Sequence, residues 1–332
     1  MSHSFANQLA IVIPSHNDWH CLRLLIPRIN GVLSGHGLTA ALVIVDDASA
    51  ESAPSDLAAD LSAISSCQVV RLRINLGHQR AIAVGLCFAH RNLSFERLLV
   101  MDADGEDRPE DILTLLRRSE SNPAPRIIFA ERAFRPAGVI FQTGYKFYRL
   151  MFRMLTGENI RFGNFSLIPI SLLHRVIASP DLWNHYAVGL LKSRLPIDRI
   201  PCDRGKRLSG SSKMSLTSLV IHGLSAMSVY NDLIGARAFL AFAGLSAGCL
   251  GLGLLAVVVK FLTALAIPGW ATYSVGLSLT ISLQAFTLSI FFIFLTLHSR
   301  TAATIIPERE YEQFIENSAD ISGTRERARV HK

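Results

Sequence analysis

Two carboxylates stand close together in Asp102-Ala103-Asp104, directly after the apolar run 98–101. If that run is a buried strand, side chains at positions i and i+2 point to the same side of the chain. Carboxylates held that close repel each other unless a cation lies between them. A hard divalent ion such as Mg2+ takes one or two protein carboxylates and fills its other positions with water and phosphate oxygens. The pair therefore indicates metal-assisted handling of a nucleoside diphosphate.

The same acidic segment has a simpler interpretation, as a solvated loop in front of a helix. Asp104 or Asp107 would then be the N-cap, and Pro109 would occupy the first helical position. The acidic pair alone fits both interpretations, and the elements around it decide between them.

Strand-like and helix-like segments alternate over roughly the first 125 residues. We expect strands at 9–13, 41–45, 69–74 and 98–101, and helices at 20–33, 55–64 and 79–90. This alternation predicts an α/β fold with a mostly parallel sheet and right-handed crossovers. In such sheets ligands bind outside the carboxyl ends of the strands. A polar cluster follows each expected strand, at 14–18, 46–47, 75–80 and 102–107, so the sequence predicts one crevice that contains all of them.

Half of the residues are apolar, and the excess lies near the C-terminus. Residues 238–259 and 269–297 carry no charge, and each stretch exceeds the roughly 20 residues that cross a bilayer. A pair of buried core helices is the alternative, but such helices rarely lack a polar face over this length. Arg237 and Arg300 flank the two stretches. The positive-inside rule then predicts a transmembrane hairpin over 237–299 in the inner membrane, with the catalytic domain and both termini cytoplasmic.

The formal net charge is +7, and cations are frequent between residues 126 and 214. With two spans predicted, anionic lipid and phosphate-bearing substrates explain this charge better than nucleic acid does. Residues 215–236 read as an amphipathic juxtamembrane helix, which either lies in the membrane interface or packs on the catalytic domain. Residues 300–332 read as a polar cytoplasmic tail that is poorly ordered beyond about Asn317. The paired spans could also pack between protomers of a homo-oligomer.

Three motifs in order resemble the inverting family 2 glycosyltransferases with the GT-A fold. They are Ile11-Val12-Ile13-Pro14-Ser15-His16-Asn17-Asp18, Val45-Asp46-Asp47-Ala48-Ser49 and Asp102-Ala103-Asp104. The resemblance covers roughly residues 7–214 and implies a GT-A (Rossmann-like) domain over 1–214 that binds a nucleotide-sugar. Further segments, followed by two spans, look like the polyisoprenyl-phosphate glycosyltransferases, which include dolichyl-phosphate mannosyltransferases and bactoprenol glucosyltransferases. These segments are Asn75-Leu76-Gly77-His78-Gln79, Gly163-Asn164-Phe165 and Arg207-Leu208-Ser209-Gly210-Ser211-Ser212-Lys213.

The resemblance implies a role for each matching position. The nucleotide-sugar donor would contact Pro14, Asn17, Asp18, Asp46, Asp47, Gln79 and Asp102. Asp102 and Asp104 would hold Mg2+ or Mn2+ on the donor diphosphate, and with Arg207 they form the expected catalytic set. The acceptor phosphate would lie against Arg135, Arg207, Ser212 and Lys213.

The chain departs from the family pattern at Asn164, where close relatives usually have Asp, and more mildly at Asp18, where Glu is more usual. Asn cannot act as a carboxylate base. An acceptor lipid phosphate needs little general-base help, because the second pKa of a phosphate monoester is about 6 and the group is largely dianionic at neutral pH. The departure therefore bears on the role of Asn164 more than on the reaction.

The predicted function is transfer of a sugar from a nucleotide diphosphate sugar to a polyprenyl phosphate at the bilayer. Two alternatives remain open. One is a transferase that acts directly on a glycolipid or polysaccharide, although the Gln-x-x-Arg-Trp motif of processive synthases is missing from the sequence. The other is a non-catalytic membrane scaffold that binds nucleotide-sugar or lipid, for which Asn164 is the only support.

Overall fold

In a computed structural model, the chain divides into two compact units. The first unit contains residues 1–142, 160–229 and 304–332, and the second contains residues 143–159 and 230–303. The structure describes residues 9–59, 61–132, 139–158, 162–209, 216–263, 267–301 and 304–322.

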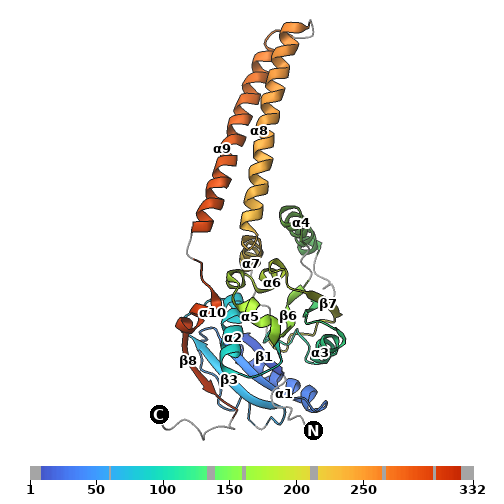
Figure 1. The fold of residues 1–332 in the computed structure, drawn as a ribbon, viewed down its shortest axis with the longest axis vertical. Coiled ribbons are helices and arrows are strands. Elements are labelled where there is room, and N and C mark those ends of the chain that lie inside the picture. The colour runs from blue at the N-terminus through green and yellow to red at the C-terminus, as the bar shows by residue number, and fades with distance from the viewer. Residues whose placement is uncertain are drawn as a thin grey trace. The chain divides into compact units, whose positions relative to one another are not determined.

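The first unit is built on an eight-stranded sheet with the order β7-β5-β6-β4-β1-β2-β3-β8 (Figure 1). Its strands are β1 (Leu9–Ser15), β2 (Ala40–Asp46), β3 (Ile64–Leu72), β4 (Arg97–Val100), β5 (Ile127–Arg132), β6 (Phe162–Pro169), β7 (Ile197–Cys202) and β8 (Ile315–Asp320). The β4-β1-β2-β3 core is parallel, whereas β6 and β8 run antiparallel to their neighbours. The predicted α/β fold with a mostly parallel sheet is therefore confirmed.

Helices cover both faces of the sheet because the central strands are apolar on both sides. On one face α1 (Trp19–Ser34) and α3 (Asp111–Ser121) pack against side chains such as Ile11 and Ile44. On the other face, α2 (His78–Asn92) leads a group that packs against side chains such as Val12 and Val45. The rest of that group is α5 (Ile170–Ile177), η1 (Pro180–Trp183) and α6 (Tyr186–Lys192).

Two expectations about local structure were wrong. The helix expected at 55–64 is a series of turns over its described residues, and β3 already begins at Ile64. The tail does not lose order near Asn317: after α10 (Pro307–Glu310) and η2 (Tyr311–Phe314), strand β8 pairs antiparallel with β3. The segment 315–320 is polar and almost fully exposed, so it lacks the apolar alternation by which strands are recognised. Side-chain hydrogen bonds from Gln68 and Arg71 on β3 hold it in place.

The juxtamembrane helix predicted over 215–236 is split. Helix α7 (Leu216–Ser228) belongs to the first unit, and α8 (Asn231–Leu262) begins the second. Together with α9 (Trp270–Thr301), α8 forms a hairpin whose two helices are long and apolar enough to cross a membrane. Small polar residues pack the pair closely, since Ser246 Oγ lies 2.8 Å from Ser282 Oγ.

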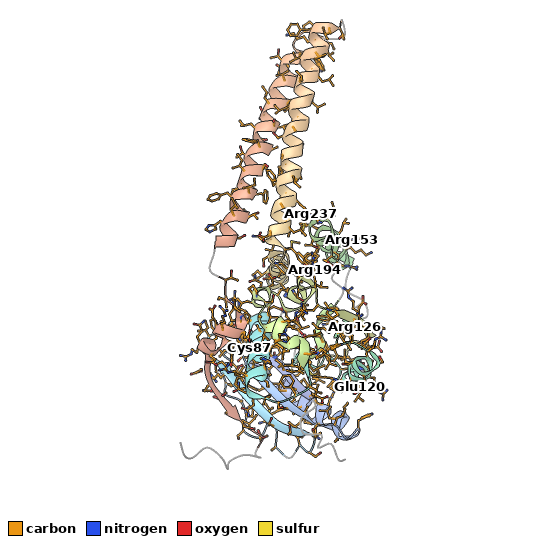
Figure 2. All side chains as sticks on the ribbon, in the orientation of Figure 1. Cys87, Glu120, Arg126, Arg153, Arg194 and Arg237 are labelled. Atoms are coloured by element: carbon orange, nitrogen blue, oxygen red, sulfur yellow. The ribbon has the colours of Figure 1, made fainter. Side chains whose placement is uncertain are left out.

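Helix α4 (Val139–Thr156) contributes residues 143–156 to the second unit, although the sequence had placed them in the glycosyltransferase domain. Arg237 on α8, labelled in Figure 2, donates hydrogen bonds to the carbonyl oxygens of Met154 at 3.0 Å and Leu155 at 2.7 Å. A cation at the C-terminal end of a helix satisfies carbonyls that have no partner within the helix. The side chain expected to mark the membrane boundary thus also fastens α4 to the hairpin.

Candidate active site

The carboxyl ends of β1, β2, β3 and β4 lie at one edge of the sheet, because these strands are parallel and adjacent. Backbone hydrogen bonds run between neighbouring strands at this edge, from Asp47 N to Ser15 O at 2.8 Å and from Met101 N to Val12 O at 3.1 Å. The predicted polar clusters are therefore gathered along one edge, as the fold requires of a ligand site in such a sheet.

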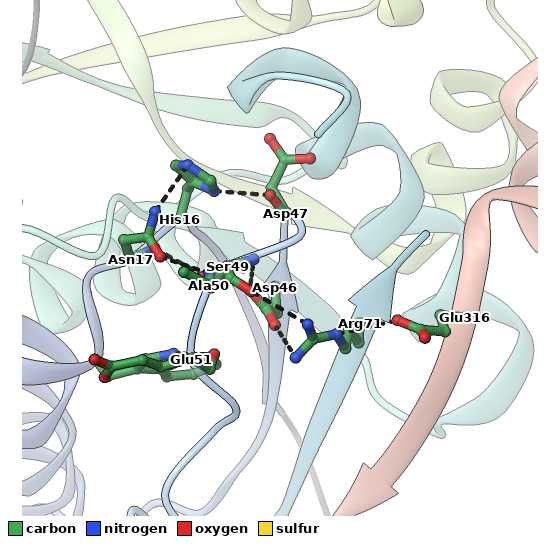
Figure 3. Close-up of polar contacts among 10 residues, drawn as sticks. His16, Asn17, Asp46, Asp47, Ser49, Ala50, Glu51, Arg71 and Glu316 are labelled. Atoms are coloured by element: carbon green, nitrogen blue, oxygen red, sulfur yellow. Dashed lines mark hydrogen bonds and ion pairs between the residues drawn. The ribbon is translucent and has the colours of Figure 1, made fainter. Parts of the chain in front are cut away.

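Asn17 connects the loop after β1 to the loop after β2 (Figure 3). Its backbone N–H donates to Ser49 Oγ at 2.8 Å, and its Oδ1 accepts from the Ala50 N–H at 2.8 Å. Asn17 itself has φ +54°, a conformation that Asn tolerates better than most residues. Pro14 lies within β1, paired with Val45. The motif at 14–18 is thus a rigid connector between two loops of the expected nucleotide site.

Asp46 and Asp47 are buried, with exposed fractions of 1% and 3%, and both have partners inside the protein. Asp47 accepts hydrogen bonds from the backbone N–H groups of Leu76 at 2.7 Å and Gly77 at 2.9 Å. Burial raises the pKa of Asp47, and these hydrogen bonds and the nearby histidines oppose that shift. Asp47 therefore orders the loop in front of α2, a role that the motif alone did not reveal.

Asp102 and Asp104 directly follow β4, and about a fifth of each side chain is exposed, 20% and 18%. Asp104 Oδ1 accepts from the Glu106 N–H at 2.9 Å, and Asp107 Oδ2 accepts from the Asp102 N–H at 2.9 Å. Asp107 thus folds the acidic loop back on itself. Helix α3 begins only at Asp111, with Glu110 at the N-cap position and no side-chain capping bond. The N-cap interpretation of Asp104 or Asp107 is therefore wrong.

Arg207 lies beside the acidic loop. Its Nη1 is 3.4 Å from Asp104 Oδ2, and its Nη2 is 3.9 Å from Asp18 Oδ1. Backbone hydrogen bonds dock its segment there, from Gly205 N to Glu106 O at 2.8 Å and from Leu208 N to Asp104 O at 2.9 Å. The sequence predicted two roles for Arg207, one at the acceptor phosphate and one in the catalytic set. The structure places Arg207 beside Asp104 and Asp18, two residues expected at the site of the nucleotide-sugar. Arg135, Ser212 and Lys213 lie outside the described residues.

A polar network centred on Asn164 reaches Asp102. Asn164 Nδ2 lies 2.9 Å from His78 Nε2, which in turn lies 3.2 Å from Asp102 Oδ1. Burial lowers the pKa of His78, but the carboxylates of Asp102, Asp107 and Asp104 raise it by more, so the net shift is upward. Gln79, expected to contact the donor, donates to Asn164 Oδ1 at 3.4 Å and accepts from the Tyr186 N–H at 2.7 Å.

Sequence reasoning singled out Asn164 as a departure and His78 only in passing, and it missed Tyr186. The Tyr186 hydroxyl lies 2.6 Å from Ser166 Oγ, on the strand that carries Asn164. No local pattern identifies Tyr186, because its relation to the site arises from the packing of α6 on the sheet. His78, Asn164 and Gln79 together form a polar wall beside Asp102.

The carboxylates of Asp102 and Asp104 at the edge of the sheet are suitable ligands for a hard divalent cation. Within the described ranges, no group of three or more His, Cys, Asp or Glu side chains is placed to hold a metal ion. Two partly exposed carboxylates are what Mg2+ or Mn2+ takes from a protein when substrate phosphates and water complete its coordination. Asp102 and Asp104 therefore fit the predicted metal, provided that a diphosphate is present.

In this α/β fold, carboxylates lie at the carboxyl ends of β2 and β4, at one edge of the sheet. This arrangement defines a nucleotide-sugar-binding class of domain with a GT-A-like sheet. The model of the family described as glycosyl transferase family 2 matches residues 10–176, and the chain belongs to that family. The match spans all three motifs from which the resemblance was inferred.

Two curated relatives are similar over less than half of their length. The uncharacterized glycosyltransferase YkcC of Bacillus subtilis is 27% identical over 43% of this chain and 43% of its own. An undecaprenyl-phosphate 4-deoxy-4-formamido-L-arabinose transferase of Serratia proteamaculans is 24% identical over 46% of this chain and 45% of its own.

Among solved structures, glucosyl-3-phosphoglycerate synthase of Mycobacterium tuberculosis, in complex with Mn2+, UDP-glucose and phosphoglyceric acid, has a TM-score of 0.50. It is 13% identical, and the match covers 69% of this chain and 80% of that one. At this identity the similarity establishes the fold.

Proposed function

We propose that this protein transfers a sugar from a nucleotide diphosphate sugar to a polyisoprenyl phosphate of the undecaprenyl or dolichyl type. The single observation that carries the proposal is the placement of Asp102 and Asp104 at the carboxyl edge of the sheet, next to Arg207. The acidic pair suits the metal of a donor diphosphate, and the arginine suits the charge that develops when the diphosphate leaves. The names of the curated relatives support a lipid phosphate as the acceptor.

The chemistry is a single displacement with inversion. A phosphate oxygen of the lipid attacks the anomeric carbon while the bond from that carbon to the nucleoside diphosphate breaks. A divalent ion, when bound, stabilises negative charge on the leaving diphosphate. Arg207 adds a second cationic partner for that charge as its ion pairs with Asp104 and Asp18 are exchanged for phosphate oxygens.

Asn164 fits this reaction without acting as a base. Its amide lies 2.9 Å from His78 and 3.4 Å from Gln79, so it joins strand β6 to the start of α2 beside Asp102. The acceptor is largely dianionic at neutral pH, since its second pKa is about 6, and it brings its own nucleophilic oxygen. A neutral side chain at position 164 also avoids adding a further negative charge next to the acidic pair.

The two candidate spans, α8 and α9, support a location in the membrane. Arg237 and Arg300 stand at the ends where positive charge favours the cytoplasm, so the termini and the sugar-transfer site would face inward. Arg135, Ser212 and Lys213 are proposed to hold the acceptor phosphate, on the strength of the sequence motif. Assembly into a homo-oligomer through the hairpin remains a prediction.

The test uses the full chain purified in detergent and in liposomes, with undecaprenyl phosphate and a panel of UDP- and GDP-sugars. We expect lipid-phosphate sugar to form with Mg2+ or Mn2+ and to stop with a chelator. Asp102→Asn and Asp104→Asn should each lower the rate by about 100-fold or more, because each removes charge from the metal site. Glu110→Gln is the matched control, since Glu110 is an acid of the same loop with a 59% exposed side chain.

Three outcomes would contradict the proposal in different ways. Full activity of Asp102→Asn/Asp104→Asn in chelator would overturn the metal assignment. Transfer to a glycolipid or polysaccharide, with none to the lipid phosphate, would favour the other transferase. Donor binding without turnover for every sugar would favour a non-catalytic scaffold.

A further inference from the structure

The C-terminal strand β8 extends the sheet next to a loop of the candidate site. It pairs antiparallel with β3, with Arg71 opposite Asn317. Asp320 at its end accepts from Gln68 Nε2 at 2.9 Å, and Arg73 Nε donates to Ile315 O at 3.0 Å. These contacts hold a polar segment in a fixed register against a strand whose other edge pairs with β2.

Arg71 connects this strand to the loop after β2 through three groups of its guanidinium (Figure 3). Its Nε donates to Glu316 Oε2 at 3.0 Å, its Nη2 donates to Ser49 O at 3.2 Å, and its Nη1 lies 3.7 Å from Asp46 Oδ2. A guanidinium presents its donors in one rigid plane, so fixing one end also fixes the direction of the other. Glu316 therefore sets where Arg71 meets Ser49.

The loop that Arg71 contacts has a strained backbone. Ala48 has φ +54°, a left-handed backbone conformation that is unfavourable for a residue with a Cβ. Asp46 Oδ1 accepts from the Ser49 N–H at 2.9 Å, and Arg71 binds the carbonyl of the same residue. With an exposed fraction of 1%, the carboxylate of Asp46 also depends on a nearby cation to offset its burial. Arg71 thus stabilises both the loop conformation and the charge within it.

We propose that Arg71 and Glu316 are positioning residues for the donor nucleoside, and that β8 thereby makes the C-terminal segment a part of the donor site. The inference rests on the proposed function, because it takes Asp46 and the loop 47–50 as the wall against which the nucleoside lies. A binding loop is held in its productive shape by residues behind it that do not touch the ligand. Loss of Arg71 or Glu316 should therefore weaken donor binding and leave the chemical step intact.

The experiment compares Arg71→Ala, Glu316→Ala and Glu316→Gln with Ser318→Ala, an exposed position of the same strand, as the matched control. The probes are UDP, GDP, CDP and ADP with MnCl2, and the donor sugar that the wild type transfers. We expect the KM of the donor to rise by about tenfold in Arg71→Ala and by about threefold in Glu316→Ala. The kcat and the KM of the lipid phosphate should stay within twofold of wild type. Glu316→Gln keeps an acceptor oxygen and should restore most of the affinity.

A second measurement separates this inference from the proposed function. Hydrogen–deuterium exchange of the ligand-free chain should speed up at the amides of Ser49 and Ala50 in Arg71→Ala and Glu316→Ala, and stay unchanged in Ser318→Ala. If the wild type binds none of the nucleotides but exchange responds in this way, the proposed function fails and the coupling of β8 to the loop stands. Unchanged exchange and unchanged donor KM in folded Arg71→Ala would overturn the inference, as would a loss confined to kcat.

Discussion

Arg207 lies between two carboxylates from different loops, with Nη1 3.4 Å from Asp104 Oδ2 and Nη2 3.9 Å from Asp18 Oδ1. Asp18 follows β1 and Asp104 follows β4, so one side chain spans the junction of two adjacent strands. Arg207 Nε also donates to Ser209 O at 3.1 Å, which restrains the guanidinium. Arg207 and the acidic loop are therefore parts of one candidate site.

Replacing Arg207 should reduce catalysis more than stability. Arg207→Ala should lower kcat by about 100-fold, because a cation that faces a developing charge contributes several kcal/mol in the transition state. Arg207→Lys keeps the charge but not the planar fork, and should lose about tenfold. Steady-state transfer rates at saturating metal measure the effect. Arg118→Ala is the control, since Arg118 pairs with Asp198 at 2.6 Å on the surface of α3. Equal rates for wild type and Arg207→Ala would remove Arg207 from the catalytic set.

Gly105→Ala should disturb the contact between the acidic loop and the segment 205–208. Gly105 has φ +79°, and a Cβ at this position would collide with the side chain of Leu208. The backbone strain costs about 1–2 kcal/mol, and relief of the collision would move the segment that carries Arg207. We expect a roughly tenfold loss of transfer rate together with a lower unfolding midpoint.

Gly37→Ala separates the two effects of that substitution. Gly37 has φ +66° and open space around its Cβ position. The Gly37→Ala variant should therefore lose a similar amount of stability and keep the wild-type rate of sugar transfer. If both glycine variants slow transfer to the same extent, the loss would come from destabilisation alone.

Acidification should destabilise the region where α7 meets α6. The rings of His185 and His222 lie 4.6 Å apart, and His185 Nδ1 accepts from the Val188 N–H at 3.4 Å. Burial and the neighbouring His222 lower the pKa of His185 to about 3, and burial and His78 lower the pKa of His222, against the opposing effect of Asp102. Both pKa values are depressed in the folded state, so the unfolded chain binds more protons once the pH falls below the ordinary value of 6.5.

The stability associated with this pair is therefore complete above pH 6.5 and is lost as the pH falls below it. The loss should be at most about 1.4 kcal/mol per pH unit for each histidine. Unfolding midpoints between pH 7.5 and 5 measure it. His222→Gln should flatten the acid side of the profile, whereas the exposed His174→Gln should leave it as it is. A flat profile for the wild type would contradict the prediction.

Gly85→Ala should destabilise the fold where α2 crosses the sheet. A Cβ at Gly85 would lie 2.5 Å from Val12 Cγ1 and 2.7 Å from Val45 Cγ2, in the middle of the core. Overpacking of this kind costs about 1–3 kcal/mol. Denaturant unfolding should show that loss, whereas Gly31→Ala in α1, where the added Cβ meets open space, should be neutral or slightly stabilising.

Local sequence patterns were sufficient to predict the central strands of the sheet and the residues that follow them. The apolar runs at β1, β2 and β4 predict buried parallel strands, and the parallel arrangement alone brings the residues after them to one edge. The uncharged stretches near the C-terminus predict long apolar helices for the same local reason, and α8 and α9 confirm them. Asp102 and Asp104 were found because they directly follow such a strand.

Contacts between distant parts of the chain decided the rest. The segment Ile315–Asp320 is polar, and it is a strand because Gln68, Arg71 and Arg73 supply partners for it, more than 240 positions earlier. The carboxylate of Asp47 binds the loop before α2 rather than facing open solvent, since burial favours groups that satisfy each other's hydrogen bonds. Composition and spacing determined which residues reach the edge of the sheet. Which of them are exposed to a ligand and which hold the others in place depended on the tertiary structure, because hydrogen bonds between loops link residues that have no fixed spacing in sequence.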